Sequence, residues 1–254
     1  MKEHYGLKPN WQQPQGQEHP NLTDHCIHLW WLPLTLNNQQ QDVALTLLSD
    51  IQRDKYHRRR TPQRKNTYLA GRYYLLNLLA QYTKQDADEI LLSYNPLNKP
   101  YLTNDKHKLQ FNFTDTNLDN QCHGLFVFCK AKHIGVDIES LQRKANFSAI
   151  SAQRFTAGEQ NYVTDQNGQI DRQRCLAIWT RKEAYGKAIG KGINFKMNQV
   201  ELVKNDAHEV KFNVDGQDWR LAQLQLNDQL ISCVAYQGHQ PLKIIAFNSA
   251  NHLP

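Results

Sequence analysis

Residues 133–139 read His-Ile-Gly-Val-Asp-Ile-Glu, a segment in which branched apolar residues alternate with other types. Successive side chains of a β-strand point to opposite faces, so the three branched residues lie on one face and Gly135, Asp137 and Glu139 lie on the other. The apolar face suits a core, and the other face carries two carboxylates side by side. The segment therefore predicts a half-buried strand with an acidic site on its polar face.

A second informative segment, residues 172–189, has the pattern of a closely packed helix. Trp179, Glu183 and Lys187 are spaced by four residues, so they share one face of that helix. A second stripe consists of small residues, namely Ala177, Thr180, Ala184 and Ala188. Gly190 and Gly192 follow and suit a left-handed helix end. The helix thus presents an acid and a base on the same side.

The rest of the chain alternates strand and helix patterns. The expected elements are a strand over 25–36, helices over 43–56 and 64–82, a strand starting at 109, a hairpin of 124–129 with 133–139 around Lys130–Lys132, and a C-terminal antiparallel meander with a turn at Asp215-Gly216. The order strand, helices, strands, then helix, strands makes two similar halves conceivable.

Composition excludes several classes of protein. The five cysteines are odd in number and include no C-x-x-C pair, which argues against a disulfide scaffold and fits a reducing compartment. No apolar run approaches the roughly 18 residues of a spanning helix, so we expect no membrane partner. Residues 1–20 are polar and lack an apolar signal region. We therefore expect a cytoplasmic protein with a flexible leader over residues 1–20.

Positive charge is concentrated in one place. The net charge is +6, and eight Lys or Arg residues lie between Arg53 and Arg72 against the single acid Asp54. The predicted helix start within this run adds the positive end of its dipole, which favours an anion. The basic run could be a solvated face, a nucleic-acid surface or a site for a phosphorylated small molecule. No nucleic-acid recognition motif accompanies it, so nucleic acid is not expected.

Two sets of side chains could bind metal. Asp137, Glu139 and Glu183 would supply the oxygen ligands that Mg²⁺ prefers, although each acid could also be a solvated surface residue and Glu183 could simply pair with Lys187. The alternative set comprises soft zinc ligands within 12 residues, Cys122, His123, Cys129 and His133. Its spacing matches no familiar zinc finger, so ordinary packing in a hairpin is the stronger interpretation.

The two informative segments together resemble the signature blocks of a known family, the 4'-phosphopantetheinyl transferases of the surfactin-synthetase-activating (Sfp-like) type. Residues 134–139 are followed by the block 179–187 in the family's order and separation. Residues 98–102 (Asn-Lys-Pro-Tyr-Leu) are similar to its Gly-Lys-Pro strand entry, and Phe111-Asn112 to the start of its Phe-Asn-x-Ser-His-Ser block. The resemblance extends from about residue 50 to residue 236. The chain departs from the family at 114–116, where Thr-Asp-Thr replaces Ser-His-Ser.

The resemblance implies transfer of the phosphopantetheine arm of coenzyme A to a serine of an acyl or peptidyl carrier protein, with release of adenosine 3',5'-bisphosphate. Mg²⁺, with Mn²⁺ as the alternative ion, would be held by Asp137, Glu139 and Glu183. Glu183 and Lys187 would be the catalytic residues, with Glu183 taking the proton of the serine. The residues implied to bind coenzyme A are Arg64, Arg58, Asn98, Lys99, Thr114 and Lys187.

The resemblance also implies an α+β monomer of two similar lobes related by a pseudo-two-fold axis, each lobe an antiparallel sheet packed on helices. We expect an N-terminal lobe over 21–132 on the coenzyme phosphate side and a C-terminal lobe over 133–254 with the metal and catalytic residues. The replacement of histidine by Asp115 motivates an alternative function, a catalytically impaired member of the family or a basic nucleotide- or RNA-binding protein.

Overall fold

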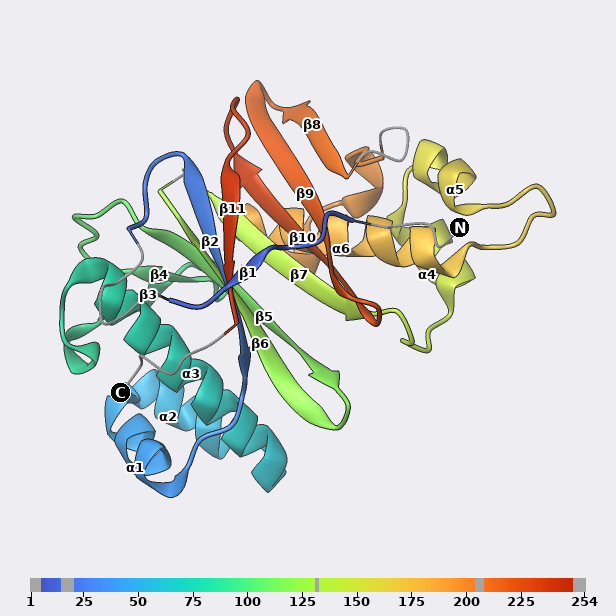
Figure 1. The fold of residues 1–254 in the computed structure, drawn as a ribbon. Helices are drawn as coiled ribbons and strands as arrows, with labels where there is room; N and C mark the ends of the chain where they lie inside the picture. Colours follow the sequence, from blue (N-terminus) through green and yellow to red (C-terminus); the bar gives the residue numbers. More distant parts are fainter. Residues whose placement is uncertain (1–5, 15–20, 131–132, 204–207, 249–254) are drawn as a thin grey trace.

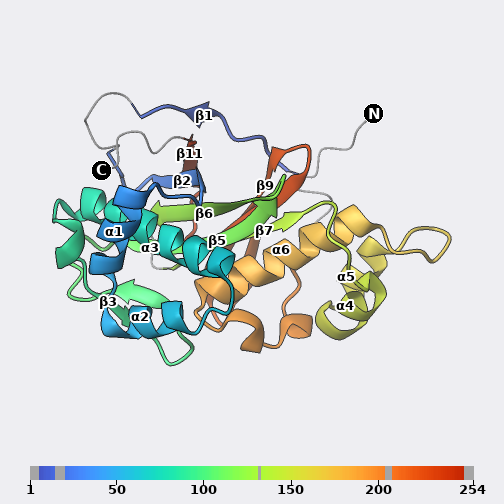
Figure 2. The same ribbon diagram turned by 90° about the horizontal axis from the view of Figure 1, so that it is seen from below.

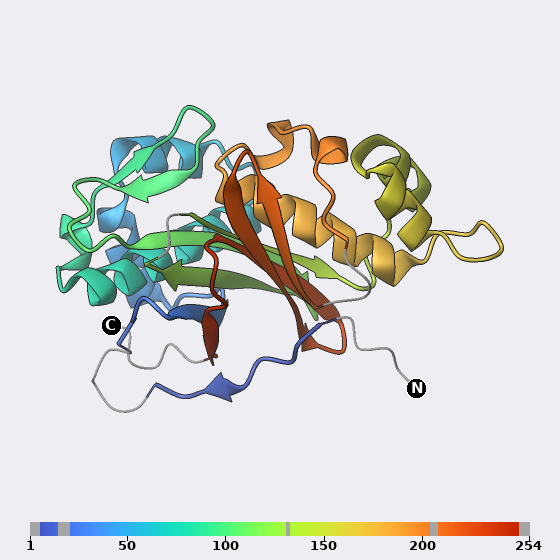
Figure 3. The ribbon, with the colours of Figure 1, turned by 90° about the horizontal axis from the view of Figure 1, so that it is seen from above.

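Two β-sheets face each other across the middle of the molecule, and helices cover the outer face of each sheet (Figure 1). The computed structural model describes residues 6–14, 21–130, 133–203 and 208–248. Views from below and above show the helices of the N-terminal part at one end of the molecule and those of the C-terminal part at the other (Figure 2, Figure 3). The fold is therefore α+β with sheets packed on helices, as the sequence predicted.

The first sheet has the strand order β1-β11-β2-β6-β5. Its strands are β1 (Trp11–Gln12), β11 (Lys243–Phe247), β2 (Cys26–Pro33), β6 (Gln121–Cys129) and β5 (Gln110–Leu118). Strands β2, β6 and β5 pair antiparallel, whereas β11 pairs parallel with both β1 and β2. The helices on its outer side are α1 (Asn38–Leu47), α2 (Asp50–His57) and α3 (Pro62–Thr83). The sheet is thus not wholly antiparallel.

The second sheet is antiparallel, with the order β7-β10-β9-β8. Its strands are β7 (Ile134–Ser140), β10 (Leu230–Gln237), β9 (Gln217–Asn227) and β8 (Glu209–Val214). The helical elements beside it are α4 (Phe147–Arg154), α5 (Ala157–Val163), α6 (Arg172–Ala188), η2 (Gly192–Asn194) and η3 (Met197–Gln199). A 3-10 helix, η1 (Ala87–Glu89), and a small hairpin of β3 (Leu92–Tyr94) and β4 (Pro100–Leu102) follow α3. The predicted C-terminal meander is confirmed.

The core between the sheets explains the alternation in residues 133–139. Ile134, Val136 and Ile138 of β7 are buried against residues of β2 and β6, including Leu29 and Val127. The opposite face of β7 meets α6. Burial of the branched residues stabilises the fold by roughly 1.5–3 kcal/mol each, which fixes which face of the strand carries the acids.

Helix α3 starts at residues that favour a helix N-terminus. Thr61 caps it by accepting a hydrogen bond from the Arg64 N–H, and Pro62 occupies the first turn, where its missing N–H is no loss. Lys84 ends the helix in the left-handed conformation. The middle of α3 is buried in the core that this helix forms with α1 and the first sheet. The basic residues at the start of α3 are therefore held on a rigid element.

Contact between β7 and α6 depends on Gly135. A side chain at this position would overlap the carbonyl oxygen of Ala184 and the backbone nitrogen of Ala188. Glycine has no such atom, so the strand and the helix touch backbone to backbone. Helix α6 begins at its cap Asp171, which accepts from two N–H groups of the first turn, and it ends before Gly190 at φ +72°. The predicted helix and its glycine end are therefore confirmed.

Two sequence-based expectations about strand pairing were wrong. Strand β6 does not form a hairpin with β7; it pairs with β5 and β2, while β7 pairs with β10. The β5–β6 turn uses Asp119 and Asn120, which both have positive φ. The second expectation was that residues 133–254 form one C-terminal lobe. Residues 243–247 instead form β11, which pairs with β1 and β2 in the first sheet.

The expected leader, residues 1–20, lies partly outside the described residues, at 1–5 and 15–20. Its described part is not a free tail. The Leu7 N–H donates to the Gln223 carbonyl (2.9 Å), the Leu7 carbonyl accepts from the Gln225 N–H (3.0 Å), and β1 extends the first sheet. The segment therefore spans both sheets. Within the ranges the structure covers, no helix is long and apolar enough to cross a bilayer.

Candidate active site

Three acids from two elements meet at one end of the β7–α6 contact. Asp137 and Glu139 project from the face of β7 that meets α6, and Glu183 projects from α6. Asp137 and Glu183 are only 6% and 8% exposed, so water screens their charges poorly. Asp137 is close enough to Glu139 and Glu183 to raise the pKa of both carboxyl groups. The predicted acidic cluster is therefore brought together.

Cationic and hydrogen-bonding groups surround these acids. The Lys187 Nζ donates to Asp137 Oδ1 (2.7 Å) and to Thr114 Oγ1 (3.0 Å), which joins α6 to β7 and β5. Glu139 accepts hydrogen bonds from the Arg143 guanidinium and from the Trp179 indole N–H (2.9 Å). The structure thus places Lys187 and Thr114 at the acidic cluster, whereas the resemblance implied Thr114 as a contact of the coenzyme.

The pKa values of the three acids are raised above those of ordinary carboxyl groups. Burial is the main cause and repulsion from Asp137 the second, and together they raise the pKa of Glu139 and of Glu183 to about 7 each. Burial also raises the pKa of Asp137, against the attraction of the Lys187 ammonium. A carboxyl group with a pKa near 7 can accept and release a proton at neutral pH, which suits acid–base chemistry.

The donor atoms fit a divalent cation in type. Asp137 Oδ2 and Glu183 Oε1 are buried without a hydrogen-bond partner, which is costly unless something else satisfies them. Mg²⁺ takes a few carboxylate oxygens and keeps several waters. Within the described ranges, no three His, Cys, Asp or Glu side chains are positioned to hold a metal as they stand. Glu139 differs from the other two acids, because its Oε1 is already bonded to the Arg143 guanidinium and the Trp179 indole.

A second, cationic part of the site lies at the start of α3. A cavity of about 440 Å³ is lined there by Arg59, Gln63, Arg64, Thr67, Tyr68, Asp115, Asn117 and Cys122. Its position near a helix N-terminus and its two arginines favour an anion. Asp115 opposes them, and its Oδ2 accepts from the Cys122 thiol. The structure thus places Arg64 in the lining of this cavity, close to the departure from the family pattern.

Arg72, which the sequence presents only as the last cation of the basic run 53–72, is buried in this region. Its side chain is 9% exposed, its guanidinium lies over the rings of Phe113 (4.7 Å) and Tyr68 (5.3 Å), and its Nε has no hydrogen-bond partner. Burial lowers the pKa of Arg72, and burial together with Arg72 and two neighbouring arginines lowers the pKa of Lys55. The one sequence signal was a charged residue within the apolar run 69–79.

Comparison with known proteins agrees with this geometry. Residues 133–235, which include β7 and α6, match the model of the 4'-phosphopantetheinyl transferase superfamily. Over these residues the chain has the sequence pattern of this superfamily of enzymes. It is 28% identical over 224 residues to the 4'-phosphopantetheinyl transferase HetI of Nostoc sp., which covers 86% of the chain and 92% of HetI.

Two further relatives match over different lengths of the transferase. A phosphopantetheinyl transferase of Thraustochytrium sp. is 24% identical over 231 residues, covering 82% of the chain and 76% of the relative. The holo-[acyl-carrier-protein] synthase of Campylobacter hominis is 35% identical over 80 residues, covering 29% and 64%. Phosphopantetheinyl transfer to carrier proteins is therefore the reaction class of the chain, with coenzyme A as the substrate that this class uses.

Of the six residues implied to bind the coenzyme, only Arg64 lines the 440 Å³ cavity of the transferase. Thr114 and Lys187 lie at the acidic cluster, and the other three lie elsewhere. Arg58 is exposed at the end of α2, and Asn98 is exposed in the β3–β4 turn with φ +66°. The Lys99 Nζ donates to the carbonyl oxygens of Ile134 (2.9 Å) and Ala188 (2.8 Å). Lys99 thus contacts the backbone of β7 and α6.

The alternative zinc set is wrong for the described residues. Cys122 and Cys129 lie near opposite ends of β6, and Cys129 is fully buried in the core between the sheets. The His123 ring stacks on Trp31 (4.8 Å) and the His133 ring on Trp219 (6.1 Å). The interpretation as ordinary packing is therefore confirmed.

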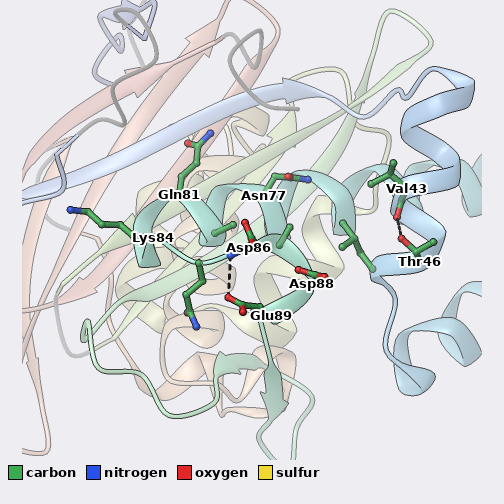
Figure 4. Close-up of a pocket in the computed structure, with 12 residues that line it drawn as sticks. Val43, Thr46, Asn77, Gln81, Lys84, Asp86, Asp88 and Glu89 are labelled. Atoms are coloured by element: carbon green, nitrogen blue, oxygen red, sulfur yellow. Dashed lines mark hydrogen bonds between the residues drawn. The ribbon is translucent and has the colours of Figure 1, made fainter.

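A separate pocket of about 680 Å³ lies between α1, the end of α3 and η1 (Figure 4). It shares no lining residue with the acidic cluster or the cationic cavity. Asp86, Asp88 and Glu89 line one side of it. These acids would repel a polyphosphate, so this pocket is a poor candidate for the coenzyme.

Proposed function

We propose that the transferase moves the 4'-phosphopantetheine group of coenzyme A to a serine hydroxyl of an apo acyl or peptidyl carrier protein and releases adenosine 3',5'-bisphosphate. The observation that carries this proposal is the cluster of Asp137, Glu139 and Glu183, with two buried, unpartnered oxygens, beside Lys187. Such a cluster is suited to a metal-bound diphosphate and to a proton acceptor at the same place.

The reaction forms one bond and breaks another at the same phosphorus. The serine oxygen bonds to the phosphorus that carries the pantetheine arm, and the bond from that phosphorus to the bridging oxygen of the diphosphate breaks. Mg²⁺, or Mn²⁺, held by the three acids would withdraw charge from the diphosphate. We assign the serine proton to Glu183, because its Oε1 is buried and unpartnered beside the proposed diphosphate site.

Lys187 supplies positive charge where the leaving group becomes more negative. Its ammonium already lies between Asp137 and Thr114, within reach of any diphosphate bound at the acids. A fixed cation that needs no rearrangement is effective in stabilising developing charge. We therefore propose that Lys187 contacts the phosphates during transfer and that Thr114 orients its ammonium.

The cationic cavity at the start of α3 is our proposed site for the 3'-phosphate of coenzyme A. Arg59 and Arg64 line it, and the buried Arg72 adds charge behind Tyr68. The negative charge of Asp115 weakens the attraction of this cavity for a phosphate. Because Asp115 stands where the family has histidine, we expect modest rather than tight coenzyme binding. The carrier is proposed to be acidic, because the net charge of +6 favours association with an anionic partner.

The decisive experiment incubates the purified protein with coenzyme A, Mg²⁺ and a panel of apo acyl and peptidyl carriers. Mass spectrometry should show a carrier heavier by one phosphopantetheine group, and the Glu183→Gln variant should leave it unchanged. The Glu209→Gln variant, which alters an exposed glutamate of β8, is the matched control. Coenzyme A binding without transfer to any carrier would instead favour the alternative of a nucleotide-binding protein.

A further inference from the structure

The β3–β4 hairpin of the first lobe reaches across to the catalytic elements of the second. Lys99 lies just before β4, and its Nζ donates hydrogen bonds of 2.9 Å to the Ile134 carbonyl and 2.8 Å to the Ala188 carbonyl. Ile134 is the first residue of β7, and Ala188 is the last residue of α6. One ammonium group thus joins the ends of the two elements that carry the acidic cluster and Lys187.

The turn that presents Lys99 is itself built around Asn95. The Asn95 Oδ1 accepts from the backbone N–H groups of Leu97 (3.0 Å) and Lys99 (2.8 Å), which fixes the turn. Its Nδ2 donates to the Gly190 carbonyl (3.1 Å), just beyond α6. The hairpin therefore holds the end of α6 at two carbonyl groups, Ala188 and Gly190.

These contacts satisfy groups that a helix end leaves open. The last carbonyls of a helix have no partner within it, and a cation there is favoured by the helix dipole. The Lys99 ammonium fills this role for α6 from another lobe. It also binds the first carbonyl of β7, so it sets how far α6 lies along β7 at the backbone contact that Gly135 permits.

The position of α6 along β7 decides the geometry of the proposed chemistry. Lys187 immediately precedes Ala188, and its Nζ lies 2.7 Å from Asp137 Oδ1. Glu183 lies one turn earlier on the same helix. A shift of α6 by a fraction of an ångström would move both groups relative to Asp137, and such displacements near reacting atoms are costly in rate.

We propose that Lys99 is a positioning residue, which holds α6 and β7 in register so that Glu183 and Lys187 face Asp137. It acts through the backbone and not through the coenzyme, since its ammonium donates to the Ile134 and Ala188 carbonyls. This proposal rests on the proposed transferase activity. It replaces the role in coenzyme binding that the family resemblance implied for Lys99.

Kinetic measurements distinguish a role of Lys99 in positioning α6 from a role in binding the coenzyme. If Lys99 positions α6, Lys99→Met should lower kcat for carrier modification at least ten-fold and leave the dissociation constant for coenzyme A within about two-fold, as measured by calorimetry. Lys99→Arg, which keeps a cation, should recover part of kcat. Asn95→Ala, which removes the second contact with the end of α6, should lower kcat about three-fold.

Controls keep the outcomes distinct. Lys106→Met alters an exposed lysine in the loop after β4 and should change neither constant. Hydrogen exchange should quicken in residues 185–191 in Lys99→Met, a readout that needs no turnover. Weaker coenzyme binding at unchanged kcat, or a lower melting temperature with unchanged kcat and unchanged exchange, would overturn the positioning role. Failure of the wild-type protein to transfer would instead overturn the proposed function.

Discussion

Replacement of Glu183 by glutamine should stabilise the metal-free protein while it abolishes transfer. Glu183 is 8% exposed, and burial with repulsion from Asp137 raises its pKa from 4.5 to about 7. A group whose folded pKa is raised in this way opposes folding when it is ionised, and it does so fully above the folded pKa. Below the unfolded pKa of 4.5 the group is neutral in both states and this penalty disappears.

The size of the effect follows from the shift. The difference between 7 and 4.5 is about 2.5 pK units, and at 1.36 kcal/mol per unit it corresponds to roughly 3 kcal/mol. Glutamine remains polar and buried, and the remaining acids relax when Glu183 is neutralised, so the net gain should be about 1–3 kcal/mol at pH 8. For a chain of this length, that gain raises the melting temperature by roughly 3–9 °C.

The assay is thermal and denaturant unfolding in a chelating buffer at pH 8 and pH 5. Glu183→Gln should exceed the wild type at pH 8, with most of the difference lost at pH 5. Glu209→Gln, at an exposed position of β8, should follow the wild type at both pH values. Equal stability of Glu183→Gln and wild type at pH 8, or a destabilised variant, would refute the inference that burial and repulsion from Asp137 disfavour the ionised Glu183.

Three further predictions concern other charges. Mg²⁺ should raise the wild-type melting temperature more at pH 8 than at pH 5, because ionised acids bind it better; an equal rise at both would contradict the site. Arg72→Leu should weaken coenzyme A binding at least ten-fold by calorimetry, and unchanged affinity would contradict its role. Glu159→Ala should lower the free energy of unfolding, measured in denaturant, by about 3–5 kcal/mol. The reason is that it leaves the fully buried Lys182 ammonium, 2.6 Å from Glu159, without its counter-charge. A loss below about 1 kcal/mol would contradict this prediction.

The features that could be predicted from the sequence are local in origin. The alternation in residues 133–139 and the four-residue spacing of Trp179, Glu183 and Lys187 each depend on the geometry of one element. Burial of one face then fixes the other, so the three acids were predicted together. The predicted strand of 133–139 and helix of 172–189 therefore agreed closely with β7 and α6 of the structure.

The features that could not be predicted depend on contacts between distant segments. The β5–β6 hairpin turns at Asp119 and Asn120, two non-glycine residues with positive φ, and the sequence pattern did not distinguish this turn from one at Lys130–Lys132. The contact of Lys99 with α6 and the burial of Arg72 between two rings depend on how the lobes assemble. No spacing within a single element reports such contacts.

The place of β11 has a consequence for how the chain reaches its final form. Residues 243–247 lie between β1 and β2, so the N-terminal half cannot close its own sheet during synthesis. Until this strand has left the ribosome, the β2 edge that includes Ile27 and Leu29 stays available to other strands. Severing the chain between the lobes should therefore yield two aggregation-prone fragments that regain solubility when they are mixed.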